Sequence, residues 1–201
     1  VGKIIDGVEV KIADDGEVLC KGPNVMMGYY KEEKMTDDVI TGDFFHTGDI
    51  GEIDEDGFLK ITDRKKEMFK TSGGKYIAPQ VIENQLKQSL FIEQIMVVGS
   101  GRKMPTALIQ PNEEFVLKWL DEEGINCDSL NDAVKETKLV QAFQSEIDIH
   151  NQYFGSWEQI KKFKLTPNEW TVVDGHLTPT MKLKRKVIAE KYSDLIESMY
   201  I

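Results

Sequence analysis

Residues 61–79 read ITDRKKEMFKTSGGKYIAP, and the patterns on the two sides of this stretch differ. The sequence before it is hairpin-like and punctuated by glycines, whereas helical patterns dominate after it. The stretch itself contains five basic side chains and the pair Gly73-Gly74, in a protein whose formal net charge is −10. We therefore expect a junction between two folding units, with an anionic ligand bound at the junction.

The composition is that of a folded globular protein. The chain has 201 residues, of which 40% are hydrophobic, and this is enough to bury a core in one or two domains. Acidic residues outnumber basic ones by 35 to 25, which argues against nonspecific binding of nucleic acid, because such binding requires a basic surface. Cys20 and Cys127 lie far apart without a His at ligand spacing, so neither a disulfide framework nor a metal site is expected.

The sequence favours a cytoplasmic setting. Unpaired cysteines are typical of a reducing compartment. No apolar run approaches the roughly 18 residues that a membrane span requires, so we expect no transmembrane segment, while peripheral membrane association stays open. Val1-Gly2-Lys3 opens in mid-pattern without an initiator Met, which indicates a fragment.

Alternating apolar and polar residues predict strands in the first third of the chain. Residues 8–12 and 17–20 alternate around an Asp14-Asp15-Gly16 turn, which is typical of a hairpin. An acidic stretch at residues 32–38 predicts a short helix, and strands resume from 44 to 63 around a turn at 54–57. Residues 1–62 therefore resemble part of a small β-barrel or sandwich.

Helical periodicity and two apolar runs follow the junction. Pro79 occupies the first turn of a predicted helix, and Asn112 can cap another. We expect strands at 95–98, 106–109, 164–165 and 170–173, and further helices from about 129 to 150 and from 185 to 200. The helical stretch between about 112 and 154 has no evident function.

Three motifs carry residues suited to binding anions, and each also has an ordinary structural explanation. His46-Thr47-Gly48-Asp49 offers an Asp that can accept hydrogen bonds from a ribose diol, although Thr-Gly-Asp is also a common turn. Residues 70–75 combine lysines with glycines that let the backbone approach a ligand; they lack P-loop spacing and also suit a solvated hairpin. Residues 177–186 form a basic loop before a helix. Cations at the N-terminus of a helix oppose its dipole, which suggests a reason beyond helix stability, whereas the structural explanation is a solvated approach to that helix.

In this order the motifs resemble the C-terminal part of an adenylate-forming enzyme of the acyl-CoA synthetase superfamily. The long-chain fatty acid CoA ligases are the most similar branch, and the resemblance covers essentially the whole chain. It is carried by GEVL at 16–19, GPNVMMGYY at 22–30, TGD at 47–49, GFL at 57–59, DRKK at 63–66, KYIAP at 75–79, IE at 82–83 and LTPTMKLKR at 177–185.

The resemblance implies an α+β fold in three parts. Residues 1–62 would be a partial β-barrel subdomain of the larger N-terminal domain, residues 63–67 a hinge, and residues 68–201 a mobile α+β C-terminal lid domain. Asp49 would bind the ribose hydroxyls of ATP, with Arg64 at the same ribose or the adjacent phosphate. Lys66 falls on the hinge position of the family.

The resemblance also assigns two catalytic loops. Gly73 and Gly74 would form the loop that enters the active site for thioester formation, with Lys75 contacting coenzyme A. Lys182 matches the lysine that bridges the substrate carboxylate and the α-phosphate. Many relatives have Gly before that lysine where this chain has Met181, so Lys184 stays open as an alternative.

The implied activity is that of a fatty acid–CoA ligase. ATP and the fatty acid would give an acyl-adenylate, and coenzyme A would take the acyl group and release AMP; Mg²⁺ is expected in the intact enzyme, although no ligand residue for it is identified. The fragment alone is expected to be inactive. An acyl-AMP ligase, a carrier-protein-loading adenylation domain and a non-catalytic nucleotide-binding or interaction module remain alternatives.

Overall fold

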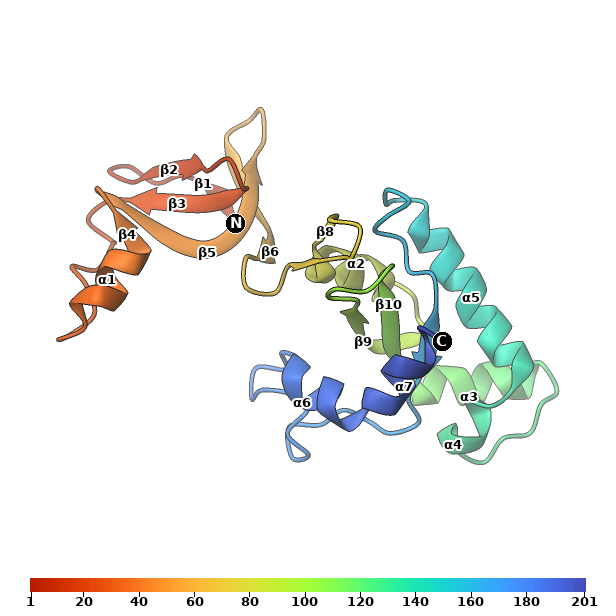
Figure 1. The fold of residues 1–201 in the computed structure, drawn as a ribbon. Helices are drawn as coiled ribbons and strands as arrows, with labels where there is room; N and C mark the ends of the chain where they lie inside the picture. Colours follow the sequence, from red (N-terminus) through yellow and green to blue (C-terminus); the bar gives the residue numbers. More distant parts are fainter. The chain divides into compact units, whose positions relative to one another are not determined.

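The computed structural model describes all 201 residues, which form two compact units, unit 1 from Val1 to Met68 and unit 2 from Phe69 to Ile201 (Figure 1). None of the helices combines the length and the apolar character that crossing a membrane requires.

Unit 1 is an open antiparallel sheet with one short helix, α1 (Glu33–Val39). The strand order is β1-β6-β5-β3-β2, and β4 pairs with β5. The strands are β1 (Gly2–Lys3), β2 (Glu9–Ile12), β3 (Glu17–Lys21), β4 (Ile40–Thr41), β5 (Phe44–Ile53) and β6 (Phe58–Arg64). Because the order ends at two different strands, the sheet is a partial barrel that does not close.

The predicted turns of unit 1 form where their chemistry indicates. Gly16 ends the first turn with a φ of 86°, a left-handed conformation that glycine adopts without strain. In the second turn the Asp54 carboxylate accepts hydrogen bonds from the backbone of Asp56 and Phe58. The second turn joins β5 to β6, and in their register Asp49 is paired with Arg64 and Ile50 with Asp63.

Unit 1 has very little apolar core of its own. Val18 is its buried hydrophobic residue, whereas Glu17 and Asp63 are buried polar ones. Burial of apolar surface is the main favourable term in folding, and this unit buries little of it. Polar contacts therefore contribute an unusually large share of its stability.

Unit 2 contains a small mixed sheet and most of the helices. Its sheet has the order β11-β10-β9, with β9 and β10 antiparallel and β11 parallel to β10. The strands are β9 (Ile92–Val98), β10 (Thr106–Pro111) and β11 (Phe163–Leu165), and β7 (Phe69–Lys70) pairs separately with β8 (Tyr76–Ile77). The helices are α2 (Pro79–Leu86), α3 (Glu113–Glu122), α4 (Leu130–Ala133), α5 (Thr137–Asn151), α6 (Arg185–Lys191) and α7 (Ser193–Ser198).

The β9–β10 hairpin carries a hydrophobic core on each face, because side chains alternate along a strand. Ile95 and Val97 point into a first core shared with α2, α3 and α5. Met96 and Leu108 point into a second core, completed by Trp170, Leu177, Ile188, Tyr192 and Met199. Figure 1 shows α5 and α6 on opposite sides of this hairpin. Unit 2 is therefore layered around one central sheet.

The structure confirms several expected elements and corrects others. Pro79 is in the first turn of α2, and Asn112 caps α3 by accepting a hydrogen bond from the backbone of Phe115 at 3.1 Å. The helix expected from about 129 to 150 is instead two helices, α4 and α5, because Ser129 caps a separate short helix through the backbone of Asp132.

Two further corrections concern the C-terminal part. The expected final helix is broken between α6 and α7 at Tyr192, whose backbone is not helical at a ψ of 24°. The strand expected at 170–173 does not form. Trp170 donates its backbone N–H to the Gln110 side chain, and the backbone then turns, with Gly175 bonded to Val172. Trp170 packs in the second core, whereas Val172 and Val173 are exposed and join no sheet.

Candidate functional site

Asp49 and Arg64, both assigned to nucleotide binding by the sequence, meet across β5 and β6. Arg64 Nε lies 2.7 Å from Asp49 Oδ1. The Thr47 hydroxyl donates to the backbone carbonyl of Val18 at 2.7 Å and accepts from the Asp49 N–H at 3.1 Å. Gly48 between them has a φ of 72°, which only glycine adopts readily. The Thr-Gly-Asp turn is thus held in one conformation, with the carboxylate at the sheet surface.

Glu17 is a site residue that the sequence reasoning placed in a strand and in a family motif but gave no role. Its side chain is buried, and it accepts hydrogen bonds from His46 Nδ1 at 2.8 Å, from the Gly48 backbone at 3.0 Å and from Lys65 Nζ at 2.8 Å. One buried carboxylate therefore connects the turn that carries Asp49 with the residue that follows Arg64. The signals in the sequence were its place in the GEVL motif at 16–19 and its position in a predicted strand.

Lys65 bridges two carboxylates, since its Nζ also lies 2.7 Å from Asp15. The hydrogen bonds that Lys65 donates to Asp15 and Glu17 raise the pKa of Lys65. Burial alone would raise the pKa of Glu17, but the bonds from Lys65, His46 and Gly48 outweigh burial and lower it. Lys65, Asp15 and Glu17 are therefore held in their charged forms at neutral pH, since the pKa of Asp15 is also lowered.

Lys66, the predicted hinge residue, is exposed and follows this anchored cluster directly. It lies in a turn in which the N–H groups of Glu67 and Met68 bond to the Arg64 carbonyl at 2.9 and 3.1 Å. The compact unit ends at Met68, two residues later. Lys66 is thus the first residue beyond the Lys65 anchor.

The glycine loop joins β7 to β8 as a tight hairpin. The Thr71 N–H bonds to the Lys75 carbonyl at 2.9 Å, and the Thr71 hydroxyl accepts from the Lys75 N–H at 3.2 Å. Gly74 has a φ of 78°, so its place in the turn favours glycine, whereas Gly73 has no such requirement.

The glycine loop is also bonded to the connection between β9 and β10. The N–H of Ser72 donates to the Arg102 carbonyl, and that of Gly101 to the Lys70 carbonyl, both at 2.8 Å. The loop is therefore held to the central hairpin of unit 2 at two points.

Lys182 is exposed near the tip of a second hairpin. Leu177 and Leu183 form a bridge at its base. The backbone of Thr178 donates to the Lys182 carbonyl at 2.8 Å, and its hydroxyl accepts from the Lys182 N–H at 3.1 Å. Met181 has a φ of 62°, in the left-handed region. Lys184 lies below the tip, where its backbone N–H bonds to the His176 carbonyl at 2.8 Å and α6 begins.

Arg185 anchors this second hairpin through a buried carboxylate. Its guanidinium contacts both oxygens of Glu83, at 2.9 and 2.5 Å, and Glu83 also accepts the Val97 backbone N–H at 2.7 Å. Glu83 is buried, on the helix that follows the glycine loop. Sequence reasoning included both residues in family motifs but gave them no role.

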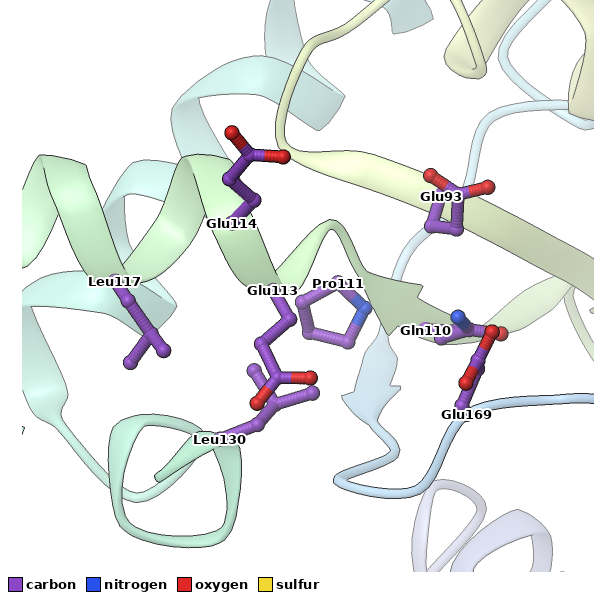
Figure 2. A pocket seen from close by; sticks show the side chains of 8 residues that line it. All are labelled: Glu93, Gln110, Pro111, Glu113, Glu114, Leu117, Leu130 and Glu169. Atoms are coloured by element: carbon purple, nitrogen blue, oxygen red, sulfur yellow. The ribbon is translucent and has the colours of Figure 1, made fainter. Parts of the chain in front are cut away.

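A pocket of about 440 Å³ in unit 2 involves none of the predicted site residues (Figure 2). Four glutamates, Glu93, Glu113, Glu114 and Glu169, surround it, together with Gln110, Pro111, Leu117 and Leu130. Four carboxylates repel anions, so this pocket does not suit ATP, coenzyme A or a fatty acid. No three His, Cys, Asp or Glu side chains of the chain are grouped to hold a metal ion.

Two known proteins that are similar to this chain are both long-chain-fatty-acid–CoA ligases. Over all 201 residues the chain is 41% identical to long-chain-fatty-acid–CoA ligase FadD15 of Mycobacterium tuberculosis, and it covers 34% of that protein. It is 35% identical to long-chain-fatty-acid–CoA ligase 6 of Rattus norvegicus, with 98% of this chain and 29% of that protein covered. The chain thus spans about a third of the length of the curated relatives it matches.

A solved structure shares the fold. The adenylation domain of a carboxylate reductase from Mycobacterium chelonae superposes with a TM-score of 0.74 at 28% identity, covering 92% of this chain and 27% of that one. Residues 67–201 match the family described as the AMP-binding enzyme C-terminal domain, and the chain therefore belongs to the AMP-binding enzymes.

Proposed function

We propose that the chain is the C-terminal part of an AMP-forming long-chain fatty acid–CoA ligase. The fatty acid carboxylate attacks the α-phosphate of ATP, which gives an acyl-adenylate and pyrophosphate. The thiol of coenzyme A then attacks the acyl carbon, so that the thioester forms and AMP leaves. The observation that carries the proposal is the similarity to FadD15 over all 201 residues, a range that includes Asp49, Arg64 and Lys182.

Asp49 and Arg64 act on the nucleotide. The 2.7 Å contact with Arg64 engages Asp49 Oδ1, which leaves Oδ2 to accept hydrogen bonds from the ribose diol. The Arg64 side chain is 53% exposed, so its guanidinium remains accessible to a phosphate. Charge-assisted bonds of this kind are about twice as strong as neutral ones, and they orient the nucleotide for attack.

Lys182 acts in the first half-reaction. Carboxylate and α-phosphate repel each other, and a positioned ammonium offsets both their repulsion and the charge that develops on the phosphorus. The left-handed backbone of Met181 supports Lys182 over Lys184 as this lysine, because it is the conformation that the glycine of many relatives adopts readily. The exposed hairpin tip leaves the Lys182 ammonium accessible.

The glycine loop acts in the second half-reaction. Gly73 and Gly74 let the backbone approach the pantetheine arm, and Lys75 supplies a cation for a phosphate of coenzyme A. Lys66 is the hinge that lets residues 68–201 present first the Lys182 hairpin and then the glycine loop. ATP would bring Mg²⁺ with it, and no residue of this chain is assigned to that ion. A cytoplasmic location, in keeping with the free Cys20 and Cys127, belongs to the same proposal.

The test separates the two half-reactions in the full-length enzyme. Lys182→Ala should lower adenylate formation, measured by ATP–pyrophosphate exchange, by about 10²–10³-fold. It should spare thioester synthesis from supplied acyl-adenylate. Lys184→Ala is the matched control, and it should leave both steps near the wild-type rate. Equal loss of both steps in Lys182→Ala, or the same selective loss in Lys184→Ala, would refute the role of Lys182.

The acyl acceptor is tested separately. Coenzyme A and an acyl carrier protein are offered to the full-length enzyme, and thioester formation on coenzyme A is expected. Transfer to the carrier alone would identify a carrier-loading adenylation domain. The 201-residue chain by itself should form no acyl-CoA.

A further inference from the structure

The segment after α5 forms a closely bonded loop that carries Trp157. Asn151, at the end of α5, both donates to and accepts from the backbone of Ile160, at 3.0 and 2.9 Å. The Gln159 side chain donates to the carbonyls of Asn151 and Phe154. The Glu158 carboxylate accepts the N–H of Gly155 at 3.1 Å. These bonds close residues 151–160 into one conformation.

The indole ring of Trp157 lies between the backbone of its own loop and Lys75 of the glycine loop. A Cβ built on Gly155 would approach two carbons of the indole ring to 2.9 Å, so the ring packs directly on the Gly155 backbone. Lys75 Nζ lies over the ring, 5.2 Å from its centroid. Trp157 is 49% exposed and belongs to neither core of unit 2. Filling of the core therefore does not explain a tryptophan at this position.

Lys75 has no carboxylate partner within 4 Å, and the indole ring is the group that holds its ammonium. The negative face of an indole attracts a cation without neutralising it. A lysine has many rotamers, so this contact limits where the ammonium is found before a ligand arrives. The charge stays available to an anion at the glycine loop.

We propose that Trp157 is a positioning residue for Lys75 and thereby strengthens binding of the phosphate-bearing thiol substrate to the glycine loop. The inference rests on the proposed function, in which that substrate is coenzyme A. It also gives the helical stretch a role. Helices α3 and α5 pack in the first core, and α5 ends at Asn151, from which the loop brings Trp157 over Lys75.

The test uses the full-length enzyme with supplied acyl-adenylate and coenzyme A. Trp157→Leu should raise the KM for coenzyme A about two- to five-fold with kcat nearly unchanged, since it removes an exposed cation–π contact. Trp157→Phe should recover part of this change, because a phenyl ring keeps a weaker negative face. ATP–pyrophosphate exchange should stay at the wild-type level in both variants.

A double-mutant cycle separates positioning from a general structural effect. In a Lys75→Met background, Trp157→Leu should cause no further rise in KM, because the cation that the indole holds is already gone. A rise of the same size in that background, or an equal rise of KM in Trp157→Leu and Trp157→Phe, would overturn the proposal.

A spectroscopic measurement on the 201-residue chain needs no enzyme activity. The side-chain methylene protons of Lys75 should be shifted upfield by the indole ring current and should return to ordinary values in Trp157→Leu. Ordinary values in the wild-type chain would overturn the positioning contact. A shifted Lys75 in a full-length enzyme that forms no acyl-CoA would instead overturn the proposed function and leave the contact established.

Discussion

Glu17→Gln is the substitution that most directly probes the turn that carries Asp49. The carboxylate of Glu17 accepts from three donors, on His46, Gly48 and Lys65. A glutamine has one acceptor oxygen and an NH₂ group of similar size. Whichever way it is oriented, its NH₂ faces donors that previously faced an oxygen, and the negative charge opposite Lys65 is lost.

The expected cost follows from these contacts. A hydrogen bond to a charged group contributes about 1.5–3 kcal/mol, and two such bonds are lost or weakened. The Lys65 and His46 side chains are 44% and 32% exposed and regain water, and Lys65 keeps Asp15 at 2.7 Å. Solvent screening therefore reduces the sum to about 2 kcal/mol.

Hydrogen exchange of the Gly48 amide is the appropriate assay, because all three tryptophans, at 119, 157 and 170, lie in unit 2. A loss of about 2 kcal/mol corresponds to roughly 30-fold faster exchange of this amide in Glu17→Gln. Urea unfolding followed by tryptophan fluorescence should be unchanged, which makes unit 2 the internal control. An unaltered Gly48 exchange rate would refute the idea that Glu17 holds this turn.

The same variant tests a pH dependence. The folded state lowers the pKa of Glu17, so its contribution is complete above the ordinary glutamate pKa of about 4.3 and is lost as pH falls through the lowered folded value. Protection of Gly48 in the wild-type chain should therefore fall steeply below about pH 4.3. Glu17→Gln should show a weaker dependence over that range.

Two further predictions concern the Lys182 hairpin. Burial, aided by the charge of Lys191 and opposed by Asp174, lowers the pKa of His176, whose Nε2 accepts from Lys191 Nζ at 2.9 Å. Below about pH 6.5 the unfolded chain gains this proton first, so stability should fall with pH until the lowered folded pKa is reached. His176→Gln keeps an acceptor but does not titrate, so it should lessen that fall in stability. Urea unfolding at pH 7 and 5.5, followed by tryptophan fluorescence, measures the fall, and an equal loss of stability in the two proteins would contradict the assignment. Met181→Gly should be between neutral and about 1.5 kcal/mol more stable, because relief of about 1–2 kcal/mol of left-handed strain matches or exceeds the cost of about 0.5–1 kcal/mol of added chain entropy. Met181→Val should be destabilised by more than about 1 kcal/mol. Thermal unfolding compares the two variants, and equal melting temperatures would contradict the strain at this position.

The sequence was a good guide to local structure and to family. Turn chemistry at Gly16 and Asp54 and capping by Asn112 each have a local cause, and the structure confirms them. The predicted membership among adenylate-forming enzymes is confirmed by the match of residues 67–201. The open sheet of unit 1 is the partial barrel that was expected. The domain limits at 62 and 67 and the individual roles of the site residues stay predictions.

What the sequence did not reveal depends on contacts between distant residues. Glu17 meets Lys65 across 48 positions, and Arg185 meets Glu83 across 102, so no local pattern marks either pair. Trp157 was given no role from the sequence, because its partner Lys75 lies 82 positions earlier by subtraction. The apolar run at 170–173 suggested a strand, but the backbone of Trp170 bonds to the Gln110 side chain in place of a ladder.

The two hairpins that the proposed function uses are both attached to the β9–β10 hairpin. The glycine loop is bonded to it through Gly101 and Arg102, and the Lys182 hairpin through Arg185, Glu83 and Val97. Neither hairpin can advance on a substrate without moving the other, because their anchors share one sheet. In the proposed function a single rotation therefore moves both hairpins together, and the two half-reactions take place one after the other.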